Sequence, residues 1–184
     1  IVVLPLPGPS CSRVLSLVHR IQPAQTVLVT SDVHLGAISS EQEEAFRAWL
    51  EQAAEVASRI VLNGDLFDFW FEYRSVILRQ HYRVLYELSA LAESGTRIVY
   101  LAGNHDFWLG SFLDEQVGIE TKYGPLEVNL QDKRFFICHG DGMIAKDWGY
   151  RMMRKILHNR FLIRSFQLIH PDLGVVLGKR ISLL

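Results

Sequence analysis

The sequence contains little of what marks a secreted or membrane-spanning protein. It has only two cysteines, Cys11 and Cys138, and their separation matches neither a disulfide framework nor a metal-binding pair, so both are expected to be free thiols. No apolar run approaches the ~20 residues of a membrane-spanning helix. The apolar, proline-containing start lacks the charged beginning and sustained apolar run of a signal peptide. These absences favour a cytoplasmic protein, and residues 1–25 form an N-terminal extension to which no function is assigned.

Neither sign of charge is in excess, because the formal net charge of the 184 residues is −1. Its distribution is uneven. Residues 1–142 carry 11 Lys and Arg against 18 Asp and Glu, whereas residues 143–184 carry 8 against 2. An acidic body suits the binding of cations, and a basic end rich in Trp, Phe, Leu and Ile suits an anionic partner with an apolar portion. With 49% hydrophobic residues the chain can bury the core of one globular domain.

Four short apolar runs, typical of buried strands, each lead to polar residues that can bind metal. They are residues 26–30, 59–63, 97–101 and 135–138. Residues 126–130 alternate between apolar and polar side chains and are expected to pair as a hairpin with residues 134–138. Since ligands collect at the carboxyl ends of strands in open α/β sheets, the polar residues are expected to converge in space.

Helical periodicity separates the first three of these strands. Residues 40–57 and 75–94 repeat apolar side chains at helical spacing. Ser40 and Glu43 form a capping box for the first helix, and Gly95 is expected to cap the end of the second. The alternation of strand and helix predicts an α/β fold.

The polar residues at the strand ends form a candidate metal site. Asp32 and His34 are expected to project to the same side of an extended segment and to bind one cation through an oxygen and a nitrogen. Asp65 follows a glycine that permits a tight turn, and its two oxygens can bridge two metals. Asn104 offers an amide oxygen and His139 an imidazole nitrogen, which would complete a second site.

Three further residues are assigned roles beside these ligands. His105 is expected to donate a hydrogen bond or proton to a metal-bound phosphate, and Asp106 is expected to orient its ring. Asp68 is expected to hydrogen-bond to the metal ligands rather than to the metal. Each has an ordinary structural alternative: Asp106 could cap a turn, Asp68 could pair with an arginine, and His139 could be a buried, hydrogen-bonded histidine. The occurrence of all four clusters in this order, each after an apolar strand, favours the site.

Four ordered motifs resemble those of the calcineurin-like metallophosphoesterases. They are Asp32-Val33-His34, Gly64-Asp65-Leu66-Phe67-Asp68, Gly103-Asn104-His105-Asp106 and His139-Gly140-Asp141. The resemblance implies a sandwich of two mixed β-sheets flanked by helices. It also implies two divalent ions, with Mn²⁺ preferred over Fe²⁺ or Zn²⁺. The ligands of one ion would be Asp32, His34 and Asp65, and those of the other Asp65, Asn104 and His139. The family's GHxH motif does not occur, so residues 26–184 are expected to be a domain that is incomplete at the C-terminus.

A closer similarity links residues 64–73, 139–142 and 170–174 with the UDP-2,3-diacylglucosamine diphosphatases of bacterial lipid A synthesis. It implies hydrolysis of UDP-2,3-diacylglucosamine to UMP and lipid X at the inner face of the bacterial inner membrane. It also implies a helical C-terminal insertion or lid, residues 147–184 here, that holds the acyl chains. One residue departs from the best-known proteobacterial branch, which has Arg in place of His105.

The same C-terminal segment supports a lipid ligand through its own chemistry. Aromatic and aliphatic residues alternate there with Lys and Arg, and we expect Arg151, Arg154 and Lys155 to contact an anionic substrate or the membrane surface. An ordinary helix with a solvated basic face, or a nucleic-acid face, uses similar residue types. An acylated UDP-sugar and peripheral membrane association are preferred here, and nucleic acid is not.

Two other classes of function share these motifs. A phosphoesterase acting on nucleotides, phosphoproteins or nucleic acid would have the same metal ligands without a pocket for acyl chains. A degenerate metal-binding module would account for the missing GHxH motif. The sequence gives no indication of the oligomeric state.

Overall fold

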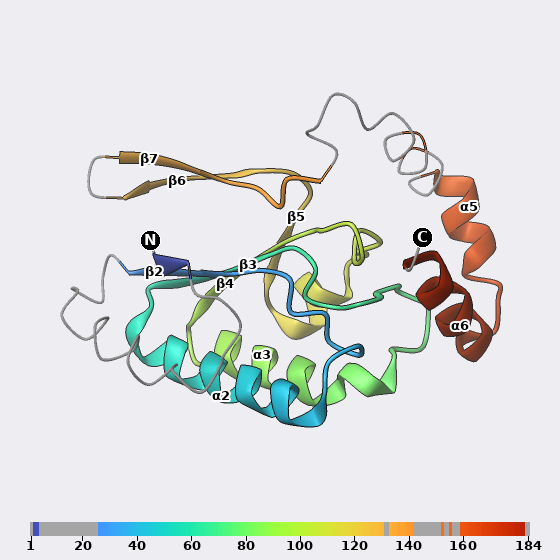
Figure 1. Ribbon diagram of the computed structural model, residues 1–184, viewed down its shortest axis with the longest axis horizontal. Coiled ribbons are helices and arrows are strands. Elements are labelled where there is room, and N and C mark those ends of the chain that lie inside the picture. The colour runs from blue at the N-terminus through green and yellow to red at the C-terminus, as the bar shows by residue number, and fades with distance from the viewer. Residues whose placement is uncertain are drawn as a thin grey trace.

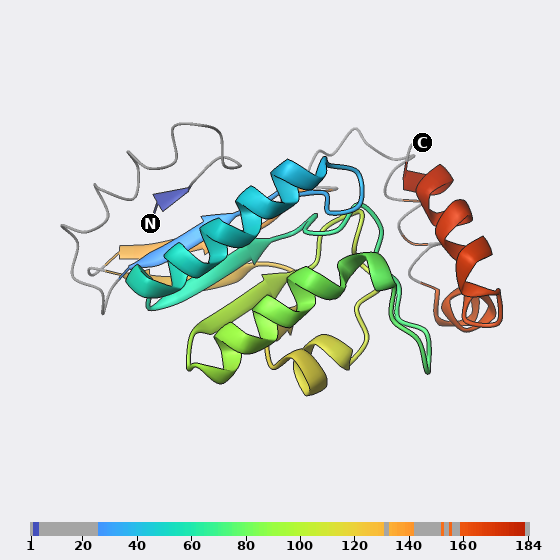
Figure 2. The same ribbon diagram turned by 90° about the horizontal axis from the view of Figure 1, so that it is seen from below.

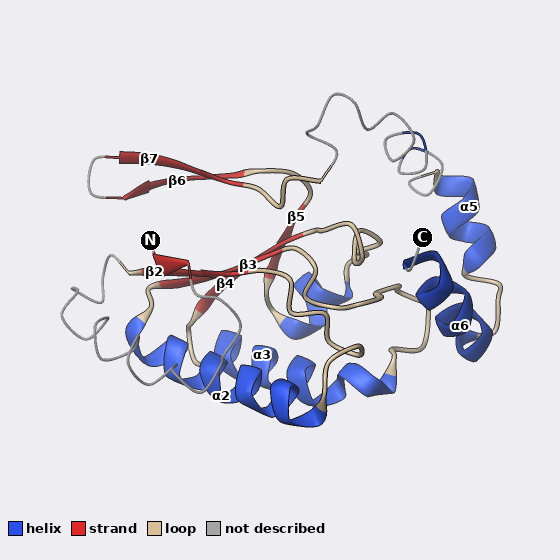
Figure 3. Ribbon diagram, in the orientation of Figure 1, coloured by secondary structure: helices blue, strands red, loops and turns tan. Residues whose placement is uncertain are grey.

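The computed structural model describes residues 2–3, 26–130, 133–141, 152, 155 and 159–182. Five strands form a parallel sheet and neighbour one another in chain order (Figure 1, Figure 3). They are β1 (Val2–Val3), β2 (Val27–Thr30), β3 (Arg59–Asn63), β4 (Arg97–Leu101) and β5 (Glu120–Lys122). Strands β2 to β4 are apolar runs because this sheet is covered on both faces. β3 and β4 have the predicted bounds.

Two helices cover one face of the sheet, α2 (Ser40–Val56) and α3 (Tyr82–Glu93) (Figure 2). Phe46 and Leu50 of α2 and Leu88 of α3 are buried with the side chains that β2, β3 and β4 direct to this face. The predicted second helix begins later than residue 75, since residues 72–78 form a loop that ends in the short 3₁₀ turn η2 (Arg79–His81).

The N-terminus of α2 differs by one residue from the prediction. Ser39, not Ser40, is the cap: its hydroxyl accepts from the Gln42 N–H at 3.3 Å, and the Gln42 side chain accepts from the Ser39 N–H at 3.0 Å. Ser40 and Glu43 have the same spacing and chemistry, so the sequence pattern alone does not separate the two registers.

A second, antiparallel sheet lies over the opposite face of the parallel sheet, as Figure 1 shows. Its strands are β6 (Leu126–Leu130) and β7 (Lys133–Ile137), which form the predicted hairpin. Leu126 and Val128 point inward and pack with Val61 and Val99 of the parallel sheet, whereas Glu127 is exposed. The predicted α/β sandwich with flanking helices is confirmed. The sheets are not mixed as predicted, because among the described residues one contains only parallel pairs and the other only an antiparallel pair.

Within its described residues, the C-terminal segment forms helices that lie beyond the carboxyl ends of the strands (Figure 1). They are α5 (Arg160–Phe166) and α6 (Pro171–Ser182). The centroid of the Phe166 ring lies 4.6 Å from that of Phe71 and 5.0 Å from that of Trp108. These contacts pack this part of the segment against the core. No helix within the described ranges combines the length and the apolar character that crossing a bilayer requires.

Candidate metal centre

Loops from both sheets meet at the carboxyl edge of the parallel sheet. The loop after β2 is bonded to the loop after β3, because the Asp32 N–H donates to the Gly64 carbonyl at 3.2 Å and the His34 N–H to the Asp65 carbonyl at 3.0 Å. The loop after β4 joins them through the His105 N–H, which donates to Asp65 Oδ1 at 3.0 Å. The segment after β7 supplies a histidine from the second sheet. The structure thus brings together all five residues predicted as ligands: Asp32, His34, Asp65, Asn104 and His139.

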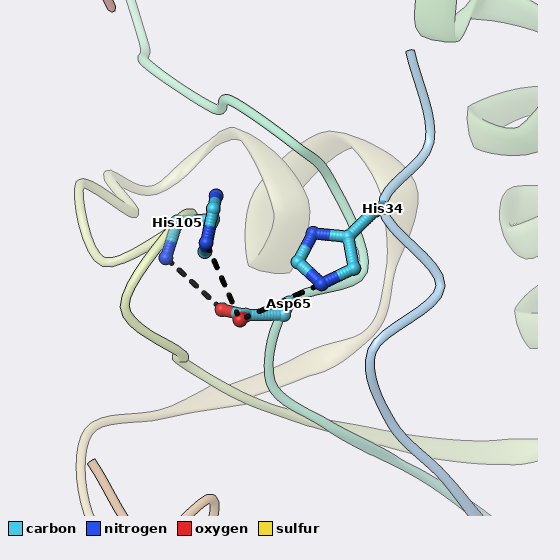
Figure 4. Close-up of side chains that lie close together, drawn as sticks. All are labelled: His34, Asp65 and His105. Atoms are coloured by element: carbon cyan, nitrogen blue, oxygen red, sulfur yellow. Dashed lines mark hydrogen bonds and ion pairs between the residues drawn. The ribbon is translucent and has the colours of Figure 1, made fainter. Parts of the chain in front are cut away.

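One carboxylate oxygen lies at the centre of this cluster. Asp65 Oδ2 is 3.3 Å from His139 Nε2, 3.9 Å from His34 Nε2 and 4.0 Å from His105 Nε2. Figure 4 shows His34 and His105 on either side of the Asp65 carboxylate. Two groups have potential ligand atoms within 4.8 Å of one another: His34, Asp65 and His105, and Asp32, Asp65 and His139. Asp65 belongs to both groups, which is the geometry expected of a bridging ligand.

The hydrogen bonds of His139 orient its ring as a ligand. Nδ1 lies 2.9 Å from the Asn63 carbonyl oxygen, so that nitrogen carries the donated proton. Nε2 then faces the site and lies 3.0 Å from Asn104 Oδ1. Metal-binding histidines usually donate their second ring N–H to a carbonyl or carboxylate in this way. In this tautomer Nε2 carries no proton and lies close to the Asp65 and Asn104 oxygens. The three atoms form a donor set that suits a cation.

Electrostatics among these side chains favour a proton on the same nitrogen. The hydrogen bond with Asp65 raises the pKa of His139 to about 9, despite the opposing effect of burial. Burial raises the pKa of Asp65, but its contacts with His139 and the His105 N–H outweigh burial, so the pKa lies below its usual value. A metal ion bound by these residues would replace the His139 proton, so binding would release protons to solvent.

Backbone strain is concentrated in the predicted ligands. Among the described residues, the non-glycine residues with positive φ are Asp32 at 56°, His34 at 53° and Asp65 at 52°. Such conformations cost of order 1–3 kcal/mol each and cluster at functional sites. The neighbouring glycines are also constrained: a Cβ on Gly103 would lie 2.2 Å from Asp65 Oδ1, and one on Gly64 would lie 2.5 Å from His139 Nδ1. This close packing and the mixed oxygen and nitrogen donors fit Mn²⁺, Fe²⁺ or Zn²⁺.

The contacts of His105 and Asp106 differ from the predicted pairing. His105 Nδ1 lies 3.2 Å from the Asp68 carbonyl oxygen and 3.8 Å from an Asp68 carboxylate oxygen, and its Nε2 faces Asp65. Asp106 is fully buried, and burial raises its pKa. Its carboxylate accepts bonds from three N–H groups and one hydroxyl: those of Gly103, Asp65, Phe67 and Tyr100. Asp68 therefore occupies the place beside His105 that was predicted for Asp106, because the Asp106 side chain turns into the core.

Two residues that contribute to the site were not predicted. Asn63 supplies the carbonyl that orients His139, and Tyr100 donates its hydroxyl proton to Asp106. Tyr100 did carry a signal, since a tyrosine inside an otherwise apolar strand usually needs a hydrogen-bond partner. A backbone carbonyl leaves no signal in side-chain chemistry, so the role of Asn63 was not readable.

A cavity of about 960 Å³ opens between the segment after β3 and the segment after β4. Its apolar walls include Phe71, Phe107, Trp108 and Ile163, and Glu72 adds a carboxylate. Phe107 and Trp108 follow directly after the His105-Asp106 pair in sequence, whereas none of the candidate metal ligands lines the cavity. Its volume is typical of small-molecule sites. Of the predicted substrate contacts, Lys155 is exposed, whereas Arg151 and Arg154 lie outside the described residues.

Comparison with known proteins finds a matching family and several relatives. Residues 25–178 match the family model described as calcineurin-like phosphoesterase. A UDP-2,3-diacylglucosamine hydrolase of Porphyromonas gingivalis is 35% identical over 162 residues, which cover 85% of this chain and 62% of that protein. Proteins of the same name are 28% identical in Haemophilus influenzae, over 82% of this chain and 63% of theirs, and 31% identical in Vibrio vulnificus, over 78% and 59%. The chain spans about three fifths of the length of these relatives.

Proposed function

The chain belongs to the calcineurin-like phosphoesterase family, and from this premise we propose that it hydrolyses the pyrophosphate of UDP-2,3-diacylglucosamine to UMP and 2,3-diacylglucosamine 1-phosphate. The names of the similar bacterial proteins support this substrate. The observation that carries the proposal is the position of Asp65 Oδ2, between 3.3 and 4.0 Å from nitrogens of three histidines. A carboxylate oxygen surrounded by imidazole nitrogens suits metal-dependent phosphoryl chemistry.

The chain's own residues would hold two divalent ions, with Mn²⁺ preferred. Asp32 and His34 would bind one ion, Asn104 and His139 the other, and Asp65 would bridge them. Bound there, the ions would lower the pKa of a water molecule and neutralise charge on the phosphate oxygens. The left-handed backbone of Asp32, His34 and Asp65 holds these side chains in place before substrate arrives.

His105 is proposed as the proton donor to the departing group. Its Nδ1 faces Asp68, and its Nε2 lies 4.0 Å from Asp65 Oδ2. When the ring is protonated, Nε2–H can donate to the oxygen that leaves phosphorus. The Asp68 carboxylate, 3.8 Å from Nδ1, would stabilise that charge and limit rotation of the ring. Asp68 thus replaces Asp106 as the orienting partner.

Recognition of the acyl chains is proposed for the aromatic cavity and the C-terminal segment. Phe107 and Trp108 of the cavity wall follow the His105-Asp106 pair in sequence, so a substrate cleaved at the metal centre could extend into this space. Each buried CH₂ contributes about 0.8 kcal/mol, so a few methylenes would give a large preference for an acylated substrate. Arg151, Arg154 and Lys155 would attract the anionic part of the substrate and the cytoplasmic face of the membrane.

Release of UMP tests the substrate directly. With Mn²⁺ present, UDP-2,3-diacylglucosamine should be cleaved far faster than UDP-N-acetylglucosamine, and a chelator should abolish the difference. Equal rates for the two compounds would favour a phosphoesterase without acyl recognition. Absence of UMP from the acylated compound under saturating Mn²⁺ would refute the proposed activity.

A further inference from the structure

A tyrosine hydroxyl lies in the core directly beneath the candidate metal centre. Tyr100 is fully buried in β4, and its ring packs against Phe67 at 6.3 Å. Its neighbours on this face of the sheet, Ile60 and Leu62 among them, are apolar. Its hydroxyl donates to Asp106 Oδ2. A phenolic oxygen in such surroundings is costly unless it is hydrogen-bonded, so this bond is the reason the position tolerates a polar group.

Asp106 connects the hydroxyl to the two loops that carry the ligands. Its Oδ1 accepts from the Gly103 N–H at 2.8 Å and from the Asp65 N–H at 3.2 Å. Its Oδ2 accepts from the Phe67 N–H at 3.2 Å in addition to the Tyr100 hydroxyl. One carboxylate therefore holds the backbone of the loop after β3 to the backbone of the loop after β4. The Asp65 backbone is bonded on one side to this carboxylate and on the other to the His34 N–H.

We propose that Tyr100 is a positioning residue for the metal centre, acting through Asp106 to fix the backbone from which Asp65 presents its bridging oxygen. The inference rests on the proposed metal centre. Without the hydroxyl, Asp106 Oδ2 would keep only the Phe67 N–H, and the carboxylate could turn away from Asp65. Because Asp65 is the residue common to both groups of ligands, a small displacement would affect both metals.

The test is the substitution Tyr100→Phe, which keeps the ring and removes only the hydroxyl. Substitution of a residue that supports the metal ligands typically weakens metal binding 10–100-fold. The dissociation constant of Y100F for Mn²⁺ should therefore be about 10–100-fold higher than that of the wild-type protein. The absorption spectrum of the Co²⁺-loaded protein should also change at saturating metal, because the geometry at Asp65 is altered. A purely structural role would lower the melting temperature of the metal-free protein but leave the saturated Co²⁺ spectrum unchanged.

Tyr73→Phe is the matched control. Its hydroxyl is also buried, has no hydrogen-bond partner among the described residues and lies against α6 near Gly174, away from Asp106. Y73F should retain wild-type Mn²⁺ affinity and Co²⁺ spectrum. If Y100F also retained both, the positioning role would be refuted while the metal centre itself stood. If the wild-type protein bound no Mn²⁺, the metal centre and this inference would fail together.

Coupling between Tyr100 and Asp106 adds a second criterion. If the hydroxyl acts through the carboxylate, Y100F and D106N should be non-additive, and the double variant should bind Mn²⁺ no more weakly than D106N alone. Additive losses would contradict the proposed path. Should Y100F fail to fold, hydrogen exchange in the wild-type protein decides: the amides of Asp65, Phe67 and Gly103 must all be protected, and rapid exchange at any of them would overturn the inference.

Discussion

At the scale of single residues, the centre depends most on Asp65. Its Oδ2 faces three imidazole nitrogens, and its Oδ1 is occupied by the His105 N–H, so the two oxygens are not equivalent. Asp65→Asn replaces one of these oxygens with an NH₂ group and removes the negative charge. We predict that D65N loses high-affinity Mn²⁺ binding and all hydrolytic activity, measured by calorimetry and by UMP release. Normal turnover with two bound metals would contradict the bridging role.

His105 should behave differently from the ligands. Its substitution by Ala removes the proton donor but leaves Asp32, His34, Asn104 and His139 in place. We predict that H105A keeps the metal content of the wild-type protein while the rate falls about 10²–10⁴-fold, the usual size of a general acid contribution. Metal content is measured by elemental analysis after gel filtration. Loss of one ion in H105A would instead identify His105 as a ligand, since His105 lies with His34 and Asp65 in one group of potential ligand atoms.

The capping of α2 gives a prediction at the scale of elements. Ser39 and Gln42 bond to each other's backbone N–H groups, whereas Ser40 is the first residue of the helix. Ser39→Ala should therefore lower the free energy of unfolding by about 1 kcal/mol, and Ser40→Ala should change it little. Urea unfolding of the metal-free protein measures both. A larger loss for S40A would restore the register that the sequence pattern predicted.

Charge in the C-terminal segment gives a second prediction at this scale. Reversal of Arg151, Arg154 and Lys155 to Glu should weaken binding to phosphatidylglycerol vesicles about 100-fold, because each basic residue near an anionic surface contributes about 1 kcal/mol. Turnover of the acylated substrate should fall as well. Hydrolysis of a small chromogenic phosphodiester should not change.

Reversal of Arg79, Arg83 and Lys133 provides the matched control for this variant, because it changes the net charge by the same amount. All three are exposed, Arg79 in η2, Arg83 in α3 and Lys133 in β7, so their reversal tests the effect of net charge alone. Vesicle binding should persist in this control. A parallel fall of all three activities in the C-terminal variant would mean that the segment supports the fold rather than the substrate.

Among the strands, the sequence predicted some with their bounds and missed others. Strands β3 and β4 were predicted with their bounds because they are short apolar runs that end sharply at polar residues. β5 (Glu120–Lys122) was not predicted, since this three-residue strand at the edge of the sheet has no buried residue and shows no apolar pattern. Its place comes from pairing with β4, a contact that no local pattern encodes.

The same distinction applies to the site. The candidate ligands were readable because their side-chain chemistry recurs at strand ends that a parallel sheet brings to one edge. The partner of His105 was not, because adjacency in sequence suggested Asp106, while the tight turn at Gly103 directs that carboxylate into the core. Tertiary packing places Asp68, from another loop, beside the imidazole.

At the scale of the whole molecule, the sandwich explains how residues more than a hundred positions apart form one centre. Asp32, Asp65 and Asn104 follow successive parallel strands, and His139 follows β7 of the second sheet, which packs on the first through Leu126, Val128 and Ile137. The aromatic contacts of Phe166 then hold the C-terminal helices next to the cavity. The metal centre and helices α5 and α6 thus lie toward the carboxyl ends of the strands, and Ile163 of α5 forms part of the cavity wall.

If Asp65 joins two metal ions, electron paramagnetic resonance of the Mn²⁺-loaded protein should detect the pair. Two ions bridged by one carboxylate couple magnetically, whereas isolated ions do not. Titration of the wild-type protein to saturation should give two Mn²⁺ per chain and the multiline spectrum of a coupled pair, and D65N should give neither. A saturated wild-type protein that showed only the six-line spectrum of uncoupled Mn²⁺ would contradict the bridging role of Asp65.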